Sequence, residues 1–491
     1  MTVLIEQADR STTRTGNRGR VPGSGLSTSD FVGAVLALVA FVVGSRVIVD
    51  NSFLTHLATG RLIVTDGAVP SSDPYSYLAS GEPWTVQSWL PSALYYLIND
   101  SVGGWGIRLF NGALTSSLMY HLWKLLAPTR QLVLRVVLAG SCLIVGAYLW
   151  TPRPLLFGLL AMVLLIRVAD RQLPLATMLP IMYLWVNSHG SFPLAGVYIV
   201  ALLLGGWADR RRFDPETVRL LVVTAFSIAV AAVNPVGWRL LWFPVHLLRR
   251  REALESVVEW AAPTFTSAYE WVFLALVGLL FVATRRGAPI KALLPAFVFS
   301  LTALLAVRNI GFASIVTAAS IAPFLRSLVG SADGQEKVRV AAVGVGAVGV
   351  CLVLATFNLV RSPPVSLDRY PVAEVQWLEE RSLVAEGDIR IVQRESVGNY
   401  LTYKYGAEAR VFVDDRFDFY PQDVLDDHID LVVGGNFQEI VERRGFDVAI
   451  WERDLPFAFW LEASEDWEVA LSTDNWIVAC RKESTAQARC L

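Results

Sequence analysis

The sequence predicts a polytopic α-helical membrane protein that ends in a soluble α/β domain, and three observations lead to this fold class. The 491 residues are 54% hydrophobic, and only 18% are charged. The mean hydropathy of +0.46 is high for a soluble protein. Apolar runs recur up to residue 360, and a mixed polar segment follows the helix-breaking sequence Arg361-Ser362-Pro363-Pro364.

The apolar runs predict about eleven membrane-spanning helices, although several runs are shorter than the roughly 20 residues that a bilayer requires. The fifth run is the weakest of them. The expected spans cover residues 31–49, 105–124, 131–150, 154–169, 173–187, 191–207, 217–234, 269–284, 289–307, 310–328 and 338–360.

The distribution of Lys and Arg between the short loops predicts the orientation of these spans. Four arginines lie in the N-terminal segment 1–30, which we expect to be disordered and cytoplasmic. Basic residues follow on the same side at Lys124 and Arg130, Arg167 and Arg171, Arg210–Arg212, Arg285 and Arg286, and Arg326, Lys337 and Arg339. The run Arg249–Arg251 falls on the opposite side, but it lies in a long loop, where the rule is weaker. The C-terminal domain is then extracytoplasmic.

Two long outer loops are expected within the membrane domain of residues 31–360. They cover residues 50–104 and 235–268. The first contains two helical segments, 53–64 and 88–98, whose apolar residues suggest helices that lie at the membrane surface.

The segment 361–485 predicts an α/β domain, followed by a short tail at 486–491. Its expected strands are Ile389–Gln393, Arg410–Asp414, Asp447–Trp451 and Trp476–Arg481, and its expected helices are 371–383, 421–430 and 435–444. It carries no nucleotide-binding glycine motif. Cys480 and Cys490 could form a disulfide only outside the cytoplasm, which leaves their pairing open.

Several polar residues lie at the predicted outer ends of the helices, and they could line one cavity. Ionisable groups at membrane depth are costly and are usually functional. The residues are Asp50, Arg153, Asn187, His189, Asn234, Glu259 and Arg308.

Each of these residues also has a structural interpretation. The two arginines could extend to lipid headgroups, and His189 could be a structural histidine. Asn234 precedes a proline and could simply end a helix. Asp50 follows the first apolar run, where the helix dipole disfavours an acid, but it could instead cap the helix that follows.

One acid with several cations at a membrane surface fits the transfer of a sugar from a polyprenyl-phosphate donor. The acceptor hydroxyl needs a general base, which a carboxylate can supply. The lipid phosphate leaves as an anion, and arginines bind phosphate through paired hydrogen bonds.

The arrangement resembles the GT-C superfamily of membrane glycosyltransferases, and in particular a bacterial branch with a domain similar to lipopolysaccharide-core glycosyltransferases. The matching residues cover most of the chain. They are Asp50, His56-Leu57-Ala58-Thr59-Gly60, Pro70-Ser71-Ser72-Asp73-Pro74-Tyr75-Ser76-Tyr77, Pro83-Trp84, Trp89-Leu90, Arg153-Pro154, Asn187-Ser188-His189-Gly190, Asn234-Pro235-Val236-Gly237, Glu259-Trp260 and Val413-Asp414-Asp415-Arg416.

The resemblance implies an enzyme of the bacterial plasma membrane that acts on the cell envelope, with a glycan or lipid acceptor and no nucleic-acid partner. It makes Asp50 the catalytic base or a metal-associated acid, and Asp73 a second candidate that could instead start a turn. Arg153 and Arg308 are the expected phosphate ligands.

The resemblance also assigns substrate contacts to His56, Glu259, Asn187, His189 and Asn234. The first loop lacks the adjacent acid pair found in some GT-C groups, so a divalent cation is left open.

Two other functions compete with this one. A transporter or flippase of lipid-linked precursors would need internal repeats and broken helices near the membrane centre, and we find no such repeat. A non-catalytic membrane scaffold is the third candidate, although the polar residues listed above argue against it.

Overall fold

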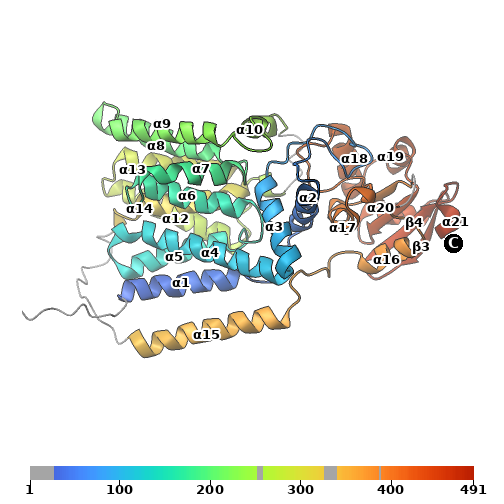
Figure 1. The fold of residues 1–491 in the computed structure, drawn as a ribbon, viewed down its shortest axis with the longest axis horizontal. Coiled ribbons are helices and arrows are strands. Elements are labelled where there is room, and N and C mark those ends of the chain that lie inside the picture. The colour runs from blue at the N-terminus through green and yellow to red at the C-terminus, as the bar shows by residue number, and fades with distance from the viewer. Residues whose placement is uncertain (1–26, 251–257, 326–339, 386–388, 491) are drawn as a thin grey trace, which may run out of the picture.

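The computed structural model describes residues 27–250, 258–325, 340–385 and 389–490. A bundle of helices forms one part of the molecule, and an α/β domain lies at one end of it (Figure 1). The first outer loop lies between the two parts. The expected disorder of residues 1–30 falls almost entirely outside the described residues, as do Arg251, Arg326, Lys337 and Arg339.

The bundle helices run roughly side by side, and each expected span overlaps one of them (Figure 1). They are α1 (Thr28–Gly44), α4 (Gly104–Leu125), α5 (Leu132–Gly146), α6 (Leu155–Ala169), α7 (Met178–Val186), α8 (Pro193–Arg210), α9 (Pro215–Val230), α12 (Ala268–Arg285), α13 (Ile290–Leu305), α14 (Ile310–Ile321) and α15 (Val340–Arg361).

The number of spanning helices is not confirmed. Among the described residues, only α12 is both long and apolar enough to cross a membrane by length and composition, and several other apolar helices are shorter. Several of the helices are shorter than the apolar runs that predicted them, among them α1, α5 and α14. The fifth expected span shows this most clearly, since α7 has 9 residues.

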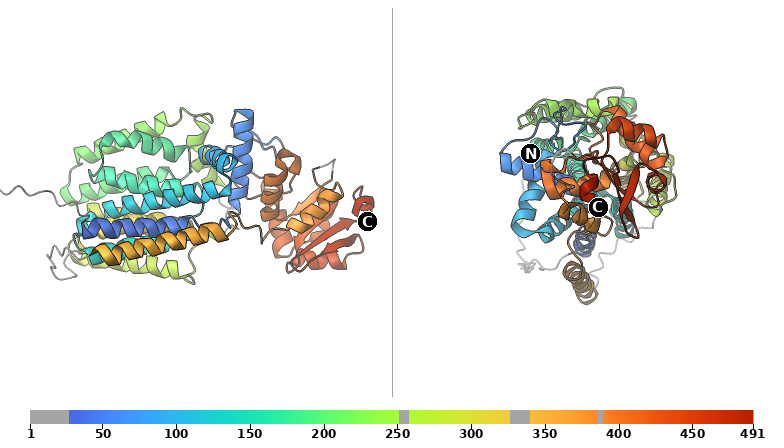
Figure 2. Two further views of the ribbon diagram at one scale, coloured as in Figure 1. Left: turned by 60° about the horizontal axis from the view of Figure 1, so that its bottom comes forward. Right: turned by 90° about the vertical axis from the view of Figure 1, so that its right-hand side faces the viewer.

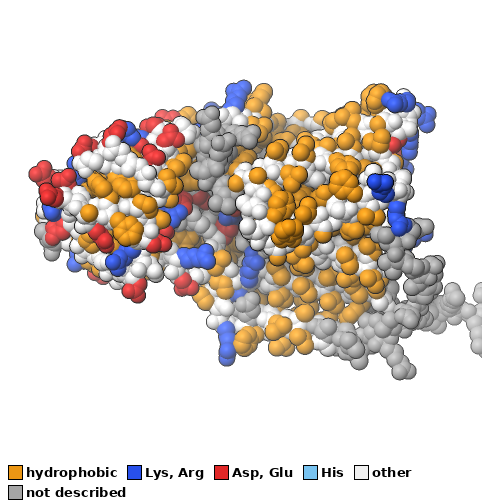
Figure 3. Space-filling model, turned by 180° about the vertical axis from the view of Figure 1, so that it is seen from behind, with side chains coloured by type: hydrophobic (Ala, Val, Ile, Leu, Met, Phe, Trp, Pro, Cys, Tyr) orange, Lys and Arg blue, Asp and Glu red, His pale blue; other side chains and the backbone are white. Residues whose placement is uncertain are grey.

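The flank of the bundle is apolar, as expected of a surface that contacts lipid. Large hydrophobic side chains are exposed along it, and the view from behind shows them between the two ends of the bundle (Figure 3). Lys and Arg side chains gather at the end farthest from the α/β domain (Figure 3). The exposed residues include Val133, Val137, Val222, Phe226, Phe281, Leu301 and Leu305.

Polar side chains inside the bundle fix the end of α1, which leads to the candidate site. The Arg108 Nε donates to the carbonyl of Ser45 at 2.7 Å, and the Asn111 Nδ2 donates to Gly44 O at 2.7 Å and to Trp150 O at 3.1 Å. These bonds satisfy carbonyls that have no partner at the end of a helix.

Two helices form in the first outer loop, as expected: α2 (Ser52–Asp66) and α3 (Trp89–Val102). However, α2 packs against α3 on one side and α17 (Glu395–Tyr405) of the α/β domain on another. It lies across the end of the bundle, at the boundary between the two parts (Figure 2). Helix α2 therefore packs between the bundle and the α/β domain, and its expected position at the membrane surface stays a prediction.

The α/β domain contains a four-stranded sheet in the order β1-β2-β4-β3. β1 (Ile391–Gln393) is parallel to β2 (Val448–Glu452), and β4 (Trp476–Arg481) is antiparallel to both β2 and β3 (Trp467–Ser472). The other helices are α16 (Val372–Glu380), α18 (Gln422–Val433), α19 (Phe437–Arg444), α20 (Pro456–Ala463) and α21 (Gln487–Cys490). Strand β3 and helices α17 and α20 were not expected from the sequence.

The strand expected at Arg410–Asp414 does not form, and that prediction is wrong. Val411 makes only an isolated bridge to Ser76 of the first loop. Its N–H donates to Tyr75 O at 2.9 Å, and the Gln393 side chain donates to Val413 O at 3.1 Å. The backbone groups of this segment are thus satisfied by the first loop and by a side chain, not by a neighbouring strand.

The first loop and the α/β domain share one hydrophobic core. Buried residues of α2, such as Phe53 and Leu57, belong to the same cluster as Val392, Leu401 and Trp451 of the sheet and its helices. The change in composition at residue 361 therefore divides the sequence into two parts, but the first loop and the α/β domain pack into the same hydrophobic core. Cys480 and Cys490 form a disulfide that ties the tail to β4.

Candidate active site

Asp50 lies at the start of α2 and not on the last turn of the first helix. Helix α1 ends at Gly44, and residues 45–51 form a connection that pairs with the segment after α15 through a bridge between Ile48 and Val365. The backbone N–H of Ser52 donates to Asp50 Oδ1 at 3.1 Å. Asp50 thus accepts from the first N–H of α2, although the N-cap residue itself, Asn51, makes no side-chain cap bond, and the carboxylate faces the favourable end of a helix dipole.

Arg153 joins Asp50 to Glu259. Its Nε donates to Asp50 Oδ2 at 2.5 Å, and its Nη1 pairs with Glu259 Oε1. Thr151 also donates to Asp50 Oδ2, at 2.9 Å. Three segments distant in sequence therefore meet here: the start of α2, the turn before α6, and the 3₁₀ turn η3 (Val258–Trp260).

Arg308 lies beside this group on the 3₁₀ turn η4 (Val307–Asn309). Its guanidinium lies over the ring of Trp260, 4.4 Å from the centroid, and its Nη2 is 3.4 Å from His189 Nε2. Within the described residues it forms no ion pair with a carboxylate within 4.0 Å. Arg308 is thus a cation held in place by an aromatic ring, with its charge available to an anion.

Asn187 and Asn234 have structural partners. Asn187 accepts from Trp89 Nε1 at 2.9 Å and donates to Tyr183 O at 2.8 Å. The Asn234 Oδ1 accepts from the backbone N–H groups of Val236 and Gly237, both at 2.8 Å. This local turn agrees with the helix-ending interpretation of Asn234. Both side chains hold the loops that surround the site.

Asp73 lies apart from Asp50, in a buried ion-pair group. Its Oδ1 is 2.8 Å from Nη2 of Arg416, which also pairs with Asp414 at 2.6 Å. It accepts from the backbone N–H groups of Tyr75 and Ser76 as well. Burial raises the pKa of the Asp73 carboxyl, and Arg416 opposes this effect. Asp73 therefore starts a turn and also joins the first loop to the α/β domain.

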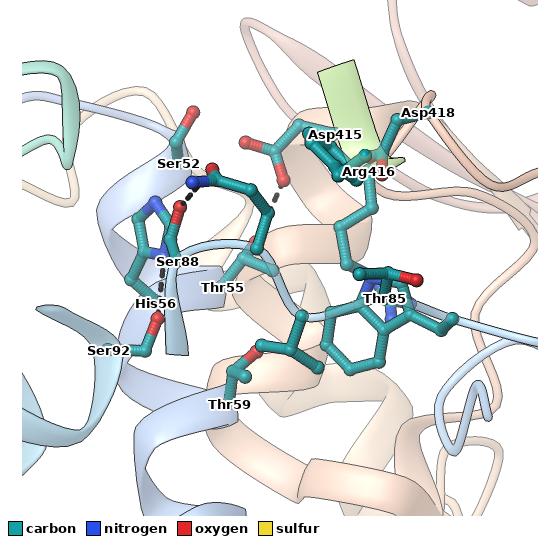
Figure 4. Close-up of a pocket in the computed structure, with 14 residues that line it drawn as sticks. Ser52, Thr55, His56, Thr59, Thr85, Ser88, Ser92, Asp415, Arg416 and Asp418 are labelled. Carbon is teal, nitrogen blue, oxygen red and sulfur yellow. Dashed lines mark hydrogen bonds between the residues drawn. The ribbon is translucent and has the colours of Figure 1, made fainter. Parts of the chain in front are cut away.

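A cavity of about 200 Å³ lies between α2, the loop before α3 and a turn of the α/β domain (Figure 4). The His56 Nδ1 is 2.9 Å from Ser92 Oγ on one wall, and Thr55 Oγ1 donates to Asp415 Oδ1 at 3.0 Å on another. Ser52, which binds Asp50 through its backbone, also lines it. Its lining residues are Ser52, Thr55, His56, Thr59, Trp84, Thr85, Val86, Gln87, Ser88, Ser92, Phe243, Asp415, Arg416 and Asp418.

Burial sets the protonation of two groups in this cavity. It lowers the pKa of His56 to about 4, even though Asp50 acts in the opposite direction, so His56 is neutral at pH 7. Burial and the neighbouring Asp414 raise the pKa of Asp415 to about 6. His56 can therefore donate or accept a hydrogen bond without charge, and Asp415 titrates near neutral pH.

Sequence reasoning missed the contribution of the α/β domain to the site. Asp415 and Thr55 are 360 positions apart. The segment Asp414-Asp415-Arg416 was noted for its charge, but no role followed from the pattern. Gln87 was missed as well, because a single amide in a loop gives no signal in one sequence.

The described part of the chain contains no complete set of ligands for a metal ion. No group of three or more His, Cys, Asp or Glu side chains is placed to hold one there. Asp50 and Glu259, the two acids of this group, are joined by Arg153. The possible divalent cation is therefore an expectation without a matching site among these residues.

No protein-family model matches the chain, and no curated protein matches its sequence. Two solved structures of the oligosaccharyltransferase from Archaeoglobus fulgidus are similar to it. The apo form has a TM-score of 0.54 at 10% identity, and covers 86% of this chain and 69% of that chain. The form tethered to an acceptor peptide with the NVT sequon has a TM-score of 0.53 at 11% identity, with 87% and 69% covered.

The chain has an oligosaccharyltransferase-like fold. The likeness to these two membrane-protein structures agrees with the expected fold class, a helical bundle followed by a C-terminal α/β domain.

Proposed function

We propose that the chain is a membrane glycosyltransferase that moves a sugar from a polyprenyl-phosphate donor to an extracytoplasmic acceptor. One observation carries the proposal: the side chains of Asp50, Arg153, Glu259 and Arg308 lie close together beside the start of α2. The resemblance of the first loop to a bacterial branch of the GT-C superfamily supports a plasma-membrane enzyme of the cell envelope.

In the proposed reaction, an acceptor hydroxyl attacks C1 of the donor sugar. A new C1–O bond forms, the bond between C1 and the phosphate oxygen breaks, and its electron pair leaves with the lipid phosphate. The hydroxyl proton passes to Asp50. Asp50 Oδ2 already accepts two hydrogen bonds, whereas Oδ1 accepts one, from Ser52. A lone pair on Oδ1 is therefore free for the proton.

The two arginines take different parts in this scheme. Arg153 pairs with a carboxylate on each side and so holds Asp50 in position. Arg308 forms no such ion pair among the described residues, and it is the group that stabilises the departing phosphate. Its contact with Trp260 and His189 restricts its conformation before the donor binds.

The proposed orientation places the N-terminus in the cytoplasm and the α/β domain outside it. Basic residues at the far ends of the bundle, including Lys124, Arg167 and Arg285, support this orientation. The disulfide between Cys480 and Cys490 supports it as well, because disulfides persist in oxidising compartments.

Transfer assays on membranes that carry variants test the proposal. We expect Asp50→Asn to lower transfer from a polyprenyl-phosphate sugar by about 10²-fold or more, the range for loss of a general base. Arg308→Met should lower it as well, whereas Arg212→Gln, at the opposite end of the bundle, should not. Transfer by Asp50→Asn at the wild-type rate would remove Asp50 as the base.

A further inference from the structure

The cavity beside α2 contains two buried donors that the protein itself does not use. Gln87 and Arg416 are 9% and 7% exposed, and both line the cavity. Within the described part of the chain, Gln87 Nε2 and Arg416 Nη1 have no hydrogen-bond partner. A buried donor without a partner is unfavourable, so native proteins rarely keep one unless something else binds it.

The chemistry of the walls indicates a neutral, hydroxyl-rich ligand. Side-chain hydroxyls surround the cavity, from Ser52, Thr55, Thr59, Thr85, Ser88 and Ser92. Such groups both donate and accept, as sugar hydroxyls do. Trp84 and Phe243 add apolar surface, against which the C–H face of a sugar ring can pack.

The charges of the cavity disfavour an anion. Arg416 is already paired with Asp73 and Asp414, so its positive charge is compensated. The carboxyls of Asp415 and Asp418 also line the cavity. A phosphate would meet these carboxylates at close range, which is unfavourable in a partly buried site. The cavity therefore favours a neutral ligand, whereas the surroundings of Arg308 favour an anion.

The size of the cavity limits the ligand to a small group. At about 200 Å³ it is smaller than the roughly 300–1,000 Å³ of most ligand pockets. A single ring fits this space better than an extended peptide does.

The cavity also adjoins the proposed base. Ser52 lines the cavity with its side chain and binds Asp50 with its backbone N–H. His56, one turn further along α2, lines the cavity, and it is close enough to Asp50 for that carboxylate to raise its pKa. A ring in the cavity would thus have its hydroxyls within the first turns of α2, beside the base.

We propose that this cavity is the acceptor subsite and that it takes a neutral sugar ring, so that the acceptor is a glycan rather than a peptide or a phospholipid headgroup. This inference rests on the proposed glycosyltransferase function. Gln87 and Arg416 donate to the ring, and Asp415, held by Thr55, accepts from one of its hydroxyls. The α/β domain thereby selects the acceptor.

Binding to the purified full chain in detergent tests the inference without any transfer. The probes are methyl glycosides of glucose, galactose and mannose, and the capped tripeptide acetyl-Asn-Val-Thr-amide, titrated by saturation-transfer difference NMR. We expect at least one glycoside to bind with a Kd of about 1 mM, and the tripeptide not to bind. Binding of the tripeptide, or saturable binding of none of the glycosides, would overturn the inference.

Variants locate the binding in the cavity. Gln87→Leu and Thr55→Val should each weaken glycoside binding at least tenfold. Matched controls are Gln376→Leu on the exposed face of α16 and Thr284→Val at the other end of the bundle, which should bind as the wild type does. Melting temperatures within a few degrees of the wild type show that the variants fold. Equal binding by the cavity variants and the controls would place the sugar elsewhere and reject the subsite.

The two proposals fail separately. Asp50→Asn should bind the glycoside normally while transfer is lost. Transfer by the wild type without glycoside binding would reject the acceptor subsite and leave the glycosyltransferase intact. Glycoside binding in the cavity with no transfer from any polyprenyl-phosphate sugar would reject the glycosyltransferase and leave a sugar-binding site.

Discussion

At the scale of one residue, the guanidinium of Arg153 has a shape that no other cationic side chain provides. It contacts Asp50 and Glu259 at the same time, through different nitrogens. A planar guanidinium can hold two carboxylates in fixed directions, whereas an ammonium is a compact point charge on a flexible chain. The position of the proposed base therefore depends on the shape of this side chain as well as on its charge.

Replacing Arg153 with lysine should lower kcat for sugar transfer by about 10–100-fold, because a 1 Å misplacement can cost this much. Steady-state kinetics on membranes would measure it, with a smaller change expected in KM. Arg171→Lys is the matched control, since Arg171 pairs with Glu216 at the opposite end of the bundle. Wild-type kcat in Arg153→Lys would show that the bridge does not position the base.

The Asp415 carboxyl should make stability depend on pH. Burial and Asp414 raise its folded pKa to about 6, above the ordinary value of 3.8. Between these values the folded state binds more protons than the unfolded state, so stability falls as pH rises from about 4 to 6. Thr55, the Ser52 side chain and Arg153 oppose the shift.

Thermal unfolding of wild type and Asp415→Asn, each at pH 4.5 and pH 7.5, measures this effect. The wild type should lose about 2 kcal/mol more than the variant between the two pH values, because folded Asp415 stays protonated from pH 4.5 to about 6 while the unfolded residue is ionised, and each pH unit is worth about 1.4 kcal/mol. Other acids titrate equally in both proteins, so the difference isolates Asp415. An identical loss in both would show that Asp415 is ionised at all these pH values.

Much of the candidate site could be predicted from the sequence, because helix ends on the same side of a bundle must be close. Asp50, Arg153, Glu259, His189 and Arg308 indeed meet. The contribution of the α/β domain could not be predicted. No local pattern indicates which turn of a separate domain packs on α2, since that choice is made by the shared core.

At the scale of elements, the close contact of α2 with α3 fixes the cavity. A Cβ on Gly60 would lie 2.0 Å from the carbonyl oxygen of Ser92, and Ser92 lines the cavity. Backbone atoms cannot give way cheaply at that distance. Only glycine permits this approach.

Gly60→Ala should therefore destabilise the protein by about 1–3 kcal/mol and weaken sugar transfer, because α3 must move away. The melting temperature and the transfer rate would both fall. Gly140→Ala in α5 is the control: its Cβ meets nothing within 4 Å, and alanine favours a helix by up to about 1 kcal/mol. Equal stability of Gly60→Ala and the wild type would contradict this packing.

The ion-pair group around Arg416 holds two elements together. Arg416→Met leaves Asp73 and Asp414 buried without their shared cation, which should cost about 3–5 kcal/mol. Arg443→Met removes a half-exposed guanidinium that pairs with Glu439 and Asp427, but Asp427 keeps its second partner, Arg444, so this change should cost about 1 kcal/mol or less. Chemical unfolding in detergent compares the two. A similar small loss in both variants would show that Arg416 does not join the elements.

The failed strand prediction has a cause at the same scale. Val411, Phe412 and Val413 are apolar and buried, which is also what a strand in the middle of a sheet requires. The difference lies in the partner, since the first loop supplies the hydrogen bonds here. Burial could be predicted from this segment, but the partner could not, because it lies more than 330 residues away.

For the whole molecule, the fold class followed from composition and from the alternation of apolar runs with basic loops. The helices lie where the apolar runs predicted them, whereas their lengths depend on turn residues. The predicted orientation of the bundle in the membrane can be tested at this scale.

A reporter that is active only in the periplasm, fused after Leu491, should be active, because the positively charged loops remain in the cytoplasm. A fusion at Gly287, in a predicted inner loop, is the control. Activity reversed between the two fusions would invert the topology.

The core that joins the first loop to the α/β domain has a consequence for how the protein is made. Residues 50–104 leave the ribosome early, whereas their packing partners at residues 372–490 are made more than 260 residues later. Until those residues follow, the face of α2 that packs against α17 is uncovered. The cavity is therefore completed only after the α/β domain has been made, and a chain interrupted before it lacks one wall of the site.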